Sequence, residues 1–281
     1  MQRAQPTESD VVTLLIINAD DYGLTEATSR AILDCHEHGV LTSTSVLVPA
    51  PAFASTIGLL AEHPNLGVGV HLALVGEDPP VLSAREVPSL VDAQGRFHIS
   101  WKQFAAAAVR GRIDPADVEK ELTAQIHAVQ AEGVPLTHLD SHQHLHEWPT
   151  LWPVIQRLAN VAKVRAVRST QAKGLGPMSV LGKLTAARAK RAGLLTPQSF
   201  AGFSHSGSLT EPELLKLIEA VPSSSASVEI GCHPGAVQDP ERYRYDWSYH
   251  WAEEASGLQS SAVRNRITSA GLRLGTFGDL R

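Results

Sequence analysis

The sequence predicts an α/β fold in which parallel strands form a sheet or barrel. Short β-rich segments alternate with longer helical segments along the 281 residues, and this order favours parallel strands joined by right-handed crossovers. Titratable side chains also follow several of the predicted strands directly. Since an α/β barrel commonly occupies a chain of this length, we expect one domain over residues 1–281.

Seven segments have the composition of buried strands. The first is a continuous apolar run, and the second and third are β-branched or spaced by glycine. The predicted strands are Val12–Asn18, Ser43–Val48, Gly67–Leu72, Thr137–Ser141, Val164–Arg168, Val228–Cys232 and, as a strand that could close the set, Leu272–Phe277.

Helical segments separate these strands. Asp114 before Pro115, and Thr210 before a first turn that contains Pro212, are typical of capped helix starts. The predicted helices are Glu26–His38, Ala52–His63, Pro115–Glu132, Pro149–Val161, Ser179–Ala192, Glu211–Ala220 and Ser260–Ala270.

Two further segments carry no helical or strand pattern. Residues 73–100 contain three prolines and little periodicity, which predicts a long loop of the kind that forms lids or binding walls. Residues 1–10 are polar and predict a flexible N-terminus without the apolar core of a signal peptide.

Composition excludes several classes of protein. The net charge is −5 and no long basic run occurs, which argues against nucleic-acid binding. No apolar run is long enough to span a membrane, and two cysteines are too few for a disulfide framework. We therefore expect a soluble cytoplasmic protein. Composition leaves the oligomeric state open, and a homodimer is one possible assembly.

A histidine-rich segment gives the strongest functional signal. Residues 138–146 read His-Leu-Asp-Ser-His-Gln-His-Leu-His, and imidazoles with a carboxylate suit a divalent metal. A polar strand end with structural histidines is the alternative for this segment alone. His144 and His146 stay open, because an extended chain would direct them into the same pocket as His142 and a turn would direct them elsewhere.

Other polar residues fall at the carboxyl ends of the predicted strands. Each has a structural explanation by itself: the Asp20-Asp21 pair before Gly23 could form a turn, and His71 could be a core histidine. Parallel strands bring these ends to one edge, however, where active sites form. The converging residues are Asp20, Asp21, His71, Asp140, His142, Arg168 and His233.

Both cysteines have structural interpretations. Cys232 beside His233 raises the alternative of a thiol nucleophile, but adjacent strand residues point to opposite faces, so Cys232 should point away from His233. Cys35 lies within a predicted helix and is expected to be a small core residue.

Aromatic residues alternate through positions 243–251. Trp247 and Trp251 in this run are candidates for stacking against a sugar ring, whereas a subunit interface or internal packing is the equal alternative.

Five motifs in order resemble the YdjC family of carbohydrate deacetylases, which includes chitooligosaccharide deacetylases. Together they span more than two hundred residues. The motifs are Asn18-Ala19-Asp20-Asp21-Tyr22-Gly23, residues 39–45, Gly69-Val70-His71-Leu72, residues 138–146 and Glu229-Ile230-Gly231-Cys232-His233-Pro234.

The resemblance implies a distorted seven-stranded β/α barrel that removes the acetyl group from an N-acetylated sugar or oligosaccharide with one divalent metal. It implies Asp21, His71 and His142 as metal ligands, Asp20 as general base and His233 as general acid. The ligand set suits Zn²⁺ by type, and the family points equally to Mg²⁺.

Two supporting roles follow from the residues themselves. Asp140 is expected to orient a ligand imidazole, and Arg168 to hold a substrate oxygen or the base, with a structural ion pair as its alternative. Other possible functions are hydrolysis of a different bond, such as a phosphoester, and non-catalytic glycan binding.

Overall fold

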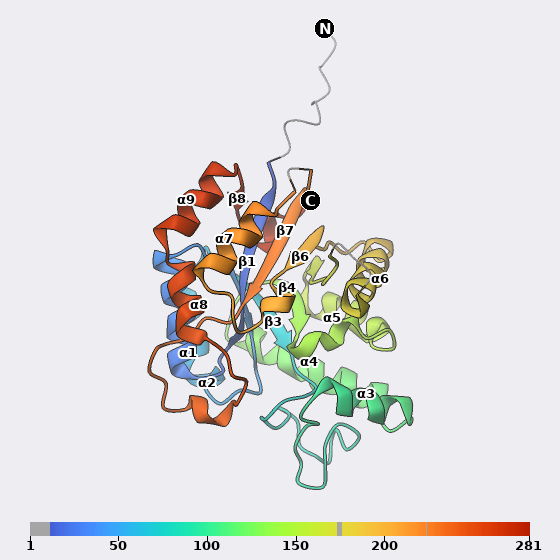
Figure 1. Cartoon of the computed structure of the whole chain (residues 1–281). Helices are drawn as coiled ribbons and strands as arrows, with labels where there is room; N and C mark the ends of the chain where they lie inside the picture. The colour runs from blue at the N-terminus through green and yellow to red at the C-terminus, as the bar shows by residue number, and fades with distance from the viewer. Residues whose placement is uncertain (1–11, 173–175, 223) are drawn as a thin grey trace.

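A parallel β-sheet forms the centre of the molecule, and helices surround it (Figure 1). The computed structural model describes residues 12–172, 176–222 and 224–281, so the predicted N-terminal segment 1–10 lies outside the described residues. The sheet runs in the order β5 (Ala166–Val167), β4 (Leu136–Ser141), β3 (Gly67–Leu72), β2 (Ser43–Val46), β1 (Leu14–Tyr22), β7 (Ser227–Cys232) and β6 (Ser199–Ala201). All neighbouring strands pair in parallel, which confirms the α/β class and the distorted barrel.

The barrel is least regular between its two end strands, β5 and β6. Leu195 bridges part of this side, because its N–H donates to Arg165 O (2.7 Å) and its carbonyl accepts from Val167 N (3.0 Å). The segment predicted at Leu272–Phe277 does not close this gap. Only β8 (Arg273–Leu274) is a strand there, and it pairs with the beginning of β1.

Nine α-helices lie in the described part of the chain. They are α1 (Glu26–His38), α2 (Phe53–Thr56), α3 (Trp101–Val109), α4 (Pro115–Ala131), α5 (Trp152–Ala162), α6 (Pro177–Arg191), α7 (Glu211–Glu219), α8 (Trp251–Leu258) and α9 (Ser261–Ser269). Short 3₁₀ helices are η2 (Ile57–Glu62), η3 (His142–Glu147), η4 (Phe203–His205), η5 (Arg242–Arg244) and η6 (Phe277–Asp279).

Three elements were absent from the sequence prediction. The strand β6 has only three residues, too few to show a period, and α8 begins inside the aromatic run. The helix α3 follows the long loop directly. The segment predicted as one helix at Ala52–His63 is instead α2 followed by η2.

Helix starts follow the capping signals in part. Asp114 accepts a hydrogen bond from Ala116 N at the start of α4, as its position before Pro115 predicts. Thr25 caps α1 in the same way through Thr28 N (2.9 Å). Thr210 makes no such bond before α7, so the predicted cap at this helix is wrong.

The segment 73–100, all of which is described, contains no helix or strand. Its apolar side chains nevertheless join the main core, where Val87, Leu90 and Phe97 are buried. Its acidic residues contact the later aromatic run, since Glu77 accepts from Trp247 Nε1 (2.8 Å) and Asp78 from the Tyr245 hydroxyl (2.9 Å). The segment therefore packs against the core and the aromatic run.

No helix in the described ranges is both long and apolar enough to cross a membrane.

Candidate active site

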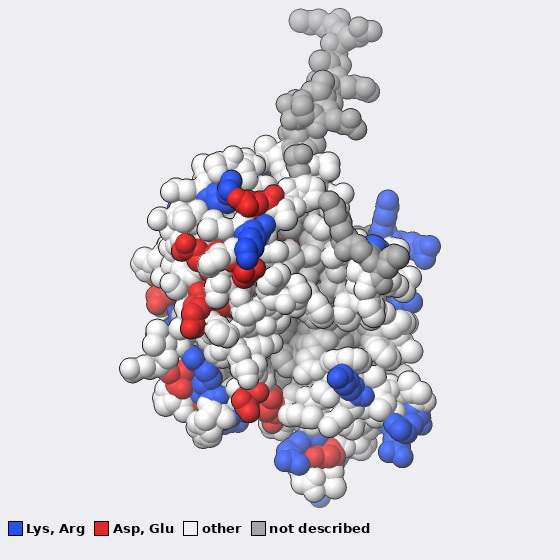
Figure 2. Space-filling model, in the orientation of Figure 1, with Lys and Arg blue, Asp and Glu red and all other residues white. Residues whose placement is uncertain are grey.

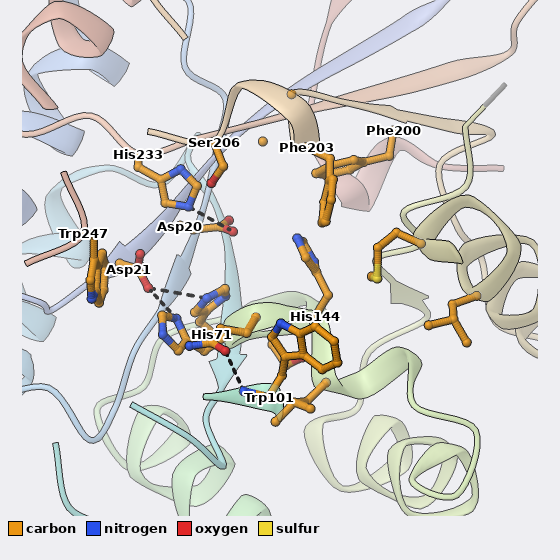
Figure 3. A pocket seen from close by; sticks show the side chains of 18 of the residues that line it. Asp20, Asp21, His71, Trp101, His144, Phe200, Phe203, Ser206, His233 and Trp247 are labelled. Atoms are coloured by element: carbon orange, nitrogen blue, oxygen red, sulfur yellow. Dashed lines mark hydrogen bonds and ion pairs between the residues drawn. The ribbon is translucent and has the colours of Figure 1, made fainter. Parts of the chain in front are cut away.

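The carboxyl ends of four strands contribute titratable side chains to one cavity of about 610 Å³. Asp20 and Asp21 come from β1, His71 from β3, and His233 from the residue after β7 (Figure 3). His142 comes from the turn after β4. Asp140 and Arg168 lie at the same edge of the sheet, but both side chains are completely buried. The structure thus brings together all seven residues that the strand-end argument singled out.

An irregularity in β1 directs two consecutive carboxylates into the cavity. In a regular strand, Asp20 and Asp21 would face opposite sides of the sheet. The pairing register of β1 with β2 shifts between Ala19 and Tyr22, and Asp21 has a φ of 66°. A bulge of this kind re-aims a side chain, and its unusual backbone conformation is typical of functional sites.

Asp21, His71 and His142 form a buried three-residue cluster. Asp21 Oδ1 lies 3.4 Å from His71 Nε2 and 3.4 Å from His142 Nδ1. Two ligand atoms bound to one zinc ion at about 2.1 Å in a tetrahedron are also separated by about 3.4 Å. Asp21 Oδ1 is buried and has no hydrogen-bond partner, so these three residues could hold a metal ion.

Asp140 fixes the orientation of the His71 ring. Its Oδ1 lies 3.1 Å from His71 Nδ1, which leaves Nε2 facing Asp21. Burial disfavours the protonated ring, but Asp140 and Asp20 outweigh this effect and raise the pKa of His71 to about 9. The same negative potential favours a divalent cation.

A second set of potential ligands, Asp20, His71 and Asp140, is also close enough to hold a metal. Both oxygens of Asp20, at 2.7 and 2.8 Å, accept from Arg168, and Asp140 Oδ2 lies 2.6 Å from the same guanidinium. Because a cation already occupies this side, the Asp21 cluster is the better candidate.

Arg168 is a completely buried cation that joins three carboxylates. Besides Asp20 and Asp140, it donates through Nε to Glu229 Oε1 (2.7 Å). Burial alone would raise the pKa of Asp20, but the charge and hydrogen bonds of Arg168 hold it well below its usual range. Asp20 is therefore ionised at neutral pH.

Glu229 differs from the other two carboxylates. Burial is the main cause that raises its pKa to about 8, and its Oε2 has no hydrogen-bond partner. Glu229 is consequently protonated near neutral pH. With His71 neutral, as a metal ligand must be, Asp20, Asp21, Asp140 and Arg168 leave the site two negative charges, which a divalent cation would balance.

His233 lies close to Asp20. Its Nε2 is 4.0 Å from Asp20 Oδ2, and its backbone N–H donates to Glu254 Oε2 (2.6 Å). Glu254 belongs to α8 and also accepts from Leu209 N (3.0 Å), so it anchors the chain after β7. The sequence carried no signal for Glu254, because its carboxylate accepts hydrogen bonds from backbone N–H groups of segments distant in the chain.

The chain turns directly after His142, which separates the later histidines. Gln143 and His144 have φ values of 50° and 56°, both in the left-handed region. His144 lines the cavity with a buried, unpartnered Nδ1. His146 points elsewhere, with its ring between Ser141 Oγ (2.7 Å) and Arg168 O (3.1 Å), and is a structural residue.

Both cysteines are buried outside the cavity. Cys232 Sγ contacts Asn18 O at 3.3 Å, and burial raises the pKa of its thiol well above the usual value. Its neighbours Gly231 and His233 line the cavity, as strand alternation predicts. Burial likewise raises the pKa of Cys35 to about 12.

The aromatic run does not form one surface. Trp247 and Tyr249 line the cavity, whereas Trp251 is only 4 % exposed and packs with Tyr245 in a small core cluster. Tyr243 is exposed to solvent. Packing therefore accounts for Trp251, and the stacking interpretation applies only to the cavity-lining members.

Comparison with known proteins shows the family to which this chain belongs. Residues 14–269 match the model of the YdjC-like proteins. The chain belongs to the YdjC-like family.

Several relatives cover nearly the whole YdjC-like chain. A carbohydrate deacetylase of Brevibacillus brevis is 30 % identical over 95 % of this chain and 99 % of its own length. A chitooligosaccharide deacetylase of Proteus mirabilis is 29 % identical, with coverages of 95 % and 98 %. A crystal structure from Enterococcus faecalis, provisionally titled a cellobiose-phosphate cleavage protein, superposes with a TM-score of 0.80 at 26 % identity and coverages of 95 % and 98 %.

Proposed function

We propose that this protein hydrolyses the acetamide of an N-acetylated sugar or oligosaccharide, releasing acetate and a free amine, with one divalent metal ion. The observation that carries this proposal is the buried Asp21–His71–His142 cluster, with Asp20 and His233 beside it in one cavity. The names of the deacetylase relatives support the same reaction.

Asp21 Oδ1, His71 Nε2 and His142 Nδ1 would hold the metal. When bound, the ion would polarise the acetamide carbonyl and lower the pKa of water at the site. Two imidazoles and one carboxylate suit Zn²⁺ by ligand type, and Mg²⁺ is the second candidate.

Asp20 is the proposed general base, and the structure favours Oδ2 as its reacting atom. Oδ1 already accepts from Asn18 Nδ2 (2.8 Å), Arg168 (2.7 Å) and Ser45 (3.3 Å), whereas Oδ2 accepts only from Arg168 in the described network. A water molecule can donate to the remaining lone pair of Oδ2 and lose its proton there during attack on the carbonyl carbon. Arg168 keeps the carboxylate in this orientation.

His233 is the proposed general acid. Its Nε2 faces Asp20 Oδ2 at 4.0 Å, so the ring lies beside the position where the attacking water would bind. Protonation of the amine nitrogen by His233 would allow the C–N bond of the tetrahedral intermediate to break, which yields acetate and the amino sugar.

The alternative reactions have less support. Phosphoester hydrolysis usually needs cationic side chains around the phosphate, and none of the described cavity-lining residues is Lys or Arg. A non-catalytic glycan-binding protein would not need Asp20 and His233 beside a potential metal cluster.

The test is acetate release from a panel of N-acetylated sugars, from the monosaccharide and chitobiose upward. Metal-stripped protein would be assayed with and without Zn²⁺ or Mg²⁺, alongside Asp20→Asn. We expect metal-dependent acetate release that falls by at least 10²-fold in the variant. Full activity of Asp20→Asn would exclude Asp20 as the general base. If the metal-loaded wild type released no acetate from any sugar of the panel, this would argue against the reaction on these sugars.

A further inference from the structure

The cavity has two chemically different sides. Asp20, Asp21, His71 and His233 gather on one side, whereas Phe200 and Phe203 lie on the other (Figure 3). We call this second side the apolar arm. It is lined by Leu145, Trp148, Met178, Leu181, Phe200 and Phe203.

Given the proposed deacetylase function, on which this inference rests, we propose that the apolar arm binds an apolar aglycone of the substrate. The substrate would then be an N-acetylated sugar that carries an alkyl or prenyl chain through an uncharged glycosidic link. The acetamide would lie at the Asp21 cluster, and the chain would extend along the arm towards α6.

The side chains of the arm suit a hydrocarbon better than a second sugar ring. A sugar needs hydrogen-bond partners for its hydroxyls, and a hydroxyl buried without one is costly. Gln143 already binds Trp101 N (2.8 Å) and Ile99 O (3.5 Å) through its amide, and the Ser141 hydroxyl is bonded to His146. Few polar groups of this side are thus left for sugar hydroxyls.

His144 marks the boundary between the two sides. Its ring contacts Phe200 and Phe203, with centroids 5.8 and 5.4 Å away, while its buried Nδ1 has no partner. An unpartnered ring nitrogen at this position suits the last hydroxyl or the glycosidic oxygen of a single sugar, with apolar groups beyond it.

The charges around the cavity favour an uncharged link over a phosphate. Asp20 and Asp21 are acidic, and no Lys or Arg occurs among the described lining residues. In the space-filling view, uncharged residues surround most of the hollow in this face, and basic and acidic side chains lie near its lower edge (Figure 2). A phosphate beside the carboxylates would meet no Lys or Arg among the described lining residues.

Two large apolar side chains at the cavity remain accessible to water. Trp101 is 45 % exposed and Phe203 is 47 % exposed, and both line the cavity. An apolar chain bound along the arm would cover Phe203, and each buried methylene would contribute about 0.8 kcal/mol, or roughly a fourfold gain in affinity.

The experiment uses glycosides of N-acetylglucosamine with methyl, butyl, hexyl and octyl chains, each below its micellar concentration. We would measure kcat/KM for acetate release, and by calorimetry the affinity of metal-loaded protein for the matching deacetylated glycosides. We expect both quantities to rise about threefold to fourfold per methylene until the arm is filled. Relative to the methyl glycoside, chitobiose and N-acetylglucosamine 1-phosphate should show smaller increases in these quantities than the hexyl glycoside.

A pair of variants on α6 tests whether the apolar chain binds in the arm. Leu181→Asn places an amide in the arm and should remove most of the dependence on chain length, whereas Leu184→Asn, at an exposed position of the same helix that does not line the cavity, should retain it. Phe203→Ser provides a second variant if Leu181→Asn does not fold.

The two readouts separate the two proposals. Affinity that rises with chain length without acetate release would support the apolar arm and contradict the deacetylase function. Equal affinity for methyl and octyl glycosides, stronger binding of chitobiose, or equal effects of Leu181→Asn and Leu184→Asn would overturn the arm whatever the reaction is.

Discussion

At the scale of single residues, Arg168 is the side chain on which the site depends most. Its guanidinium is 0 % exposed and contacts Asp20, Asp140 and Glu229, which come from three different strands. Arg168→Met would leave Asp20 and Asp140 buried without their cation. We expect a loss of about 3–5 kcal/mol in the free energy of unfolding, measured by urea denaturation.

Arg157→Met is the matched control for this variant. Arg157 pairs with Glu119 at the surface, with roughly half of its side chain exposed, so solvent screens the pair. A similar loss of stability in both variants would show that burial of the Arg168 network is not the cause.

Glu229 gives a residue-scale prediction about pH. Its pKa in the folded protein, about 8, lies above the ordinary value of 4.5, so the folded state retains a proton that the unfolded chain has lost. The stabilisation from this group is complete below about pH 4.5 and is lost as the pH rises towards 8. Glu229→Gln remains neutral throughout.

We therefore expect wild-type stability to fall relative to Glu229→Gln between pH 5 and pH 8.5, by up to a few kcal/mol. Urea denaturation of both metal-free proteins at the two pH values measures this difference, in which the other titrating groups cancel. A constant difference between the proteins would contradict a raised pKa.

At the scale of elements, the pairing of β3 with β4 depends on a glycine, because a side chain at this position would collide with a neighbouring ring. Gly69 lies against the buried ring of His138, which stacks on Phe277 with centroids 3.7 Å apart. A Cβ at position 69 would lie 2.4 Å from the ring, so Gly69→Ala must displace a packed imidazole.

We expect Gly69→Ala to cost about 1–3 kcal/mol of stability in a thermal or urea unfolding experiment. Gly58→Ala is its control, because a Cβ there would meet nothing within 4 Å. Comparable stability of the two variants would show that the His138 stack adjusts without cost.

At the scale of the whole molecule, the potential metal ligands join three parts of the barrel. Asp21 belongs to β1, His71 to β3 and His142 to η3, so the cluster is assembled only in the folded chain. A metal that binds only the folded state stabilises it by about 2.7 kcal/mol at a concentration one hundred times its Kd.

Metal-stripped protein should therefore melt several degrees lower than the same protein with saturating Zn²⁺ or Mg²⁺. Asp21→Asn should lose most of this shift in a thermal melt. An unchanged shift in Asp21→Asn would place the metal elsewhere.

Much of the fold follows from local sequence. Gly67–Leu72 and Glu26–His38 have the predicted bounds in the structure, because each shows a clear pattern over a whole element. The arrangement of the strand-end residues was also predictable, since all parallel strands direct their carboxyl ends to one edge. Short elements such as β6 escaped prediction because three residues show no period.

The sequence by itself determined the class of fold, the edge at which the site lies and the residues that converge there. The family resemblance already implied Asp21 together with His71 and His142. Only the tertiary structure decided that Asp20 pairs with Arg168 and that His144 and Trp251 lie in different environments. The reason is that these assignments depend on a bulge in β1, a left-handed turn after His142 and contacts between distant segments. The separation between residues in sequence carries no information about such contacts.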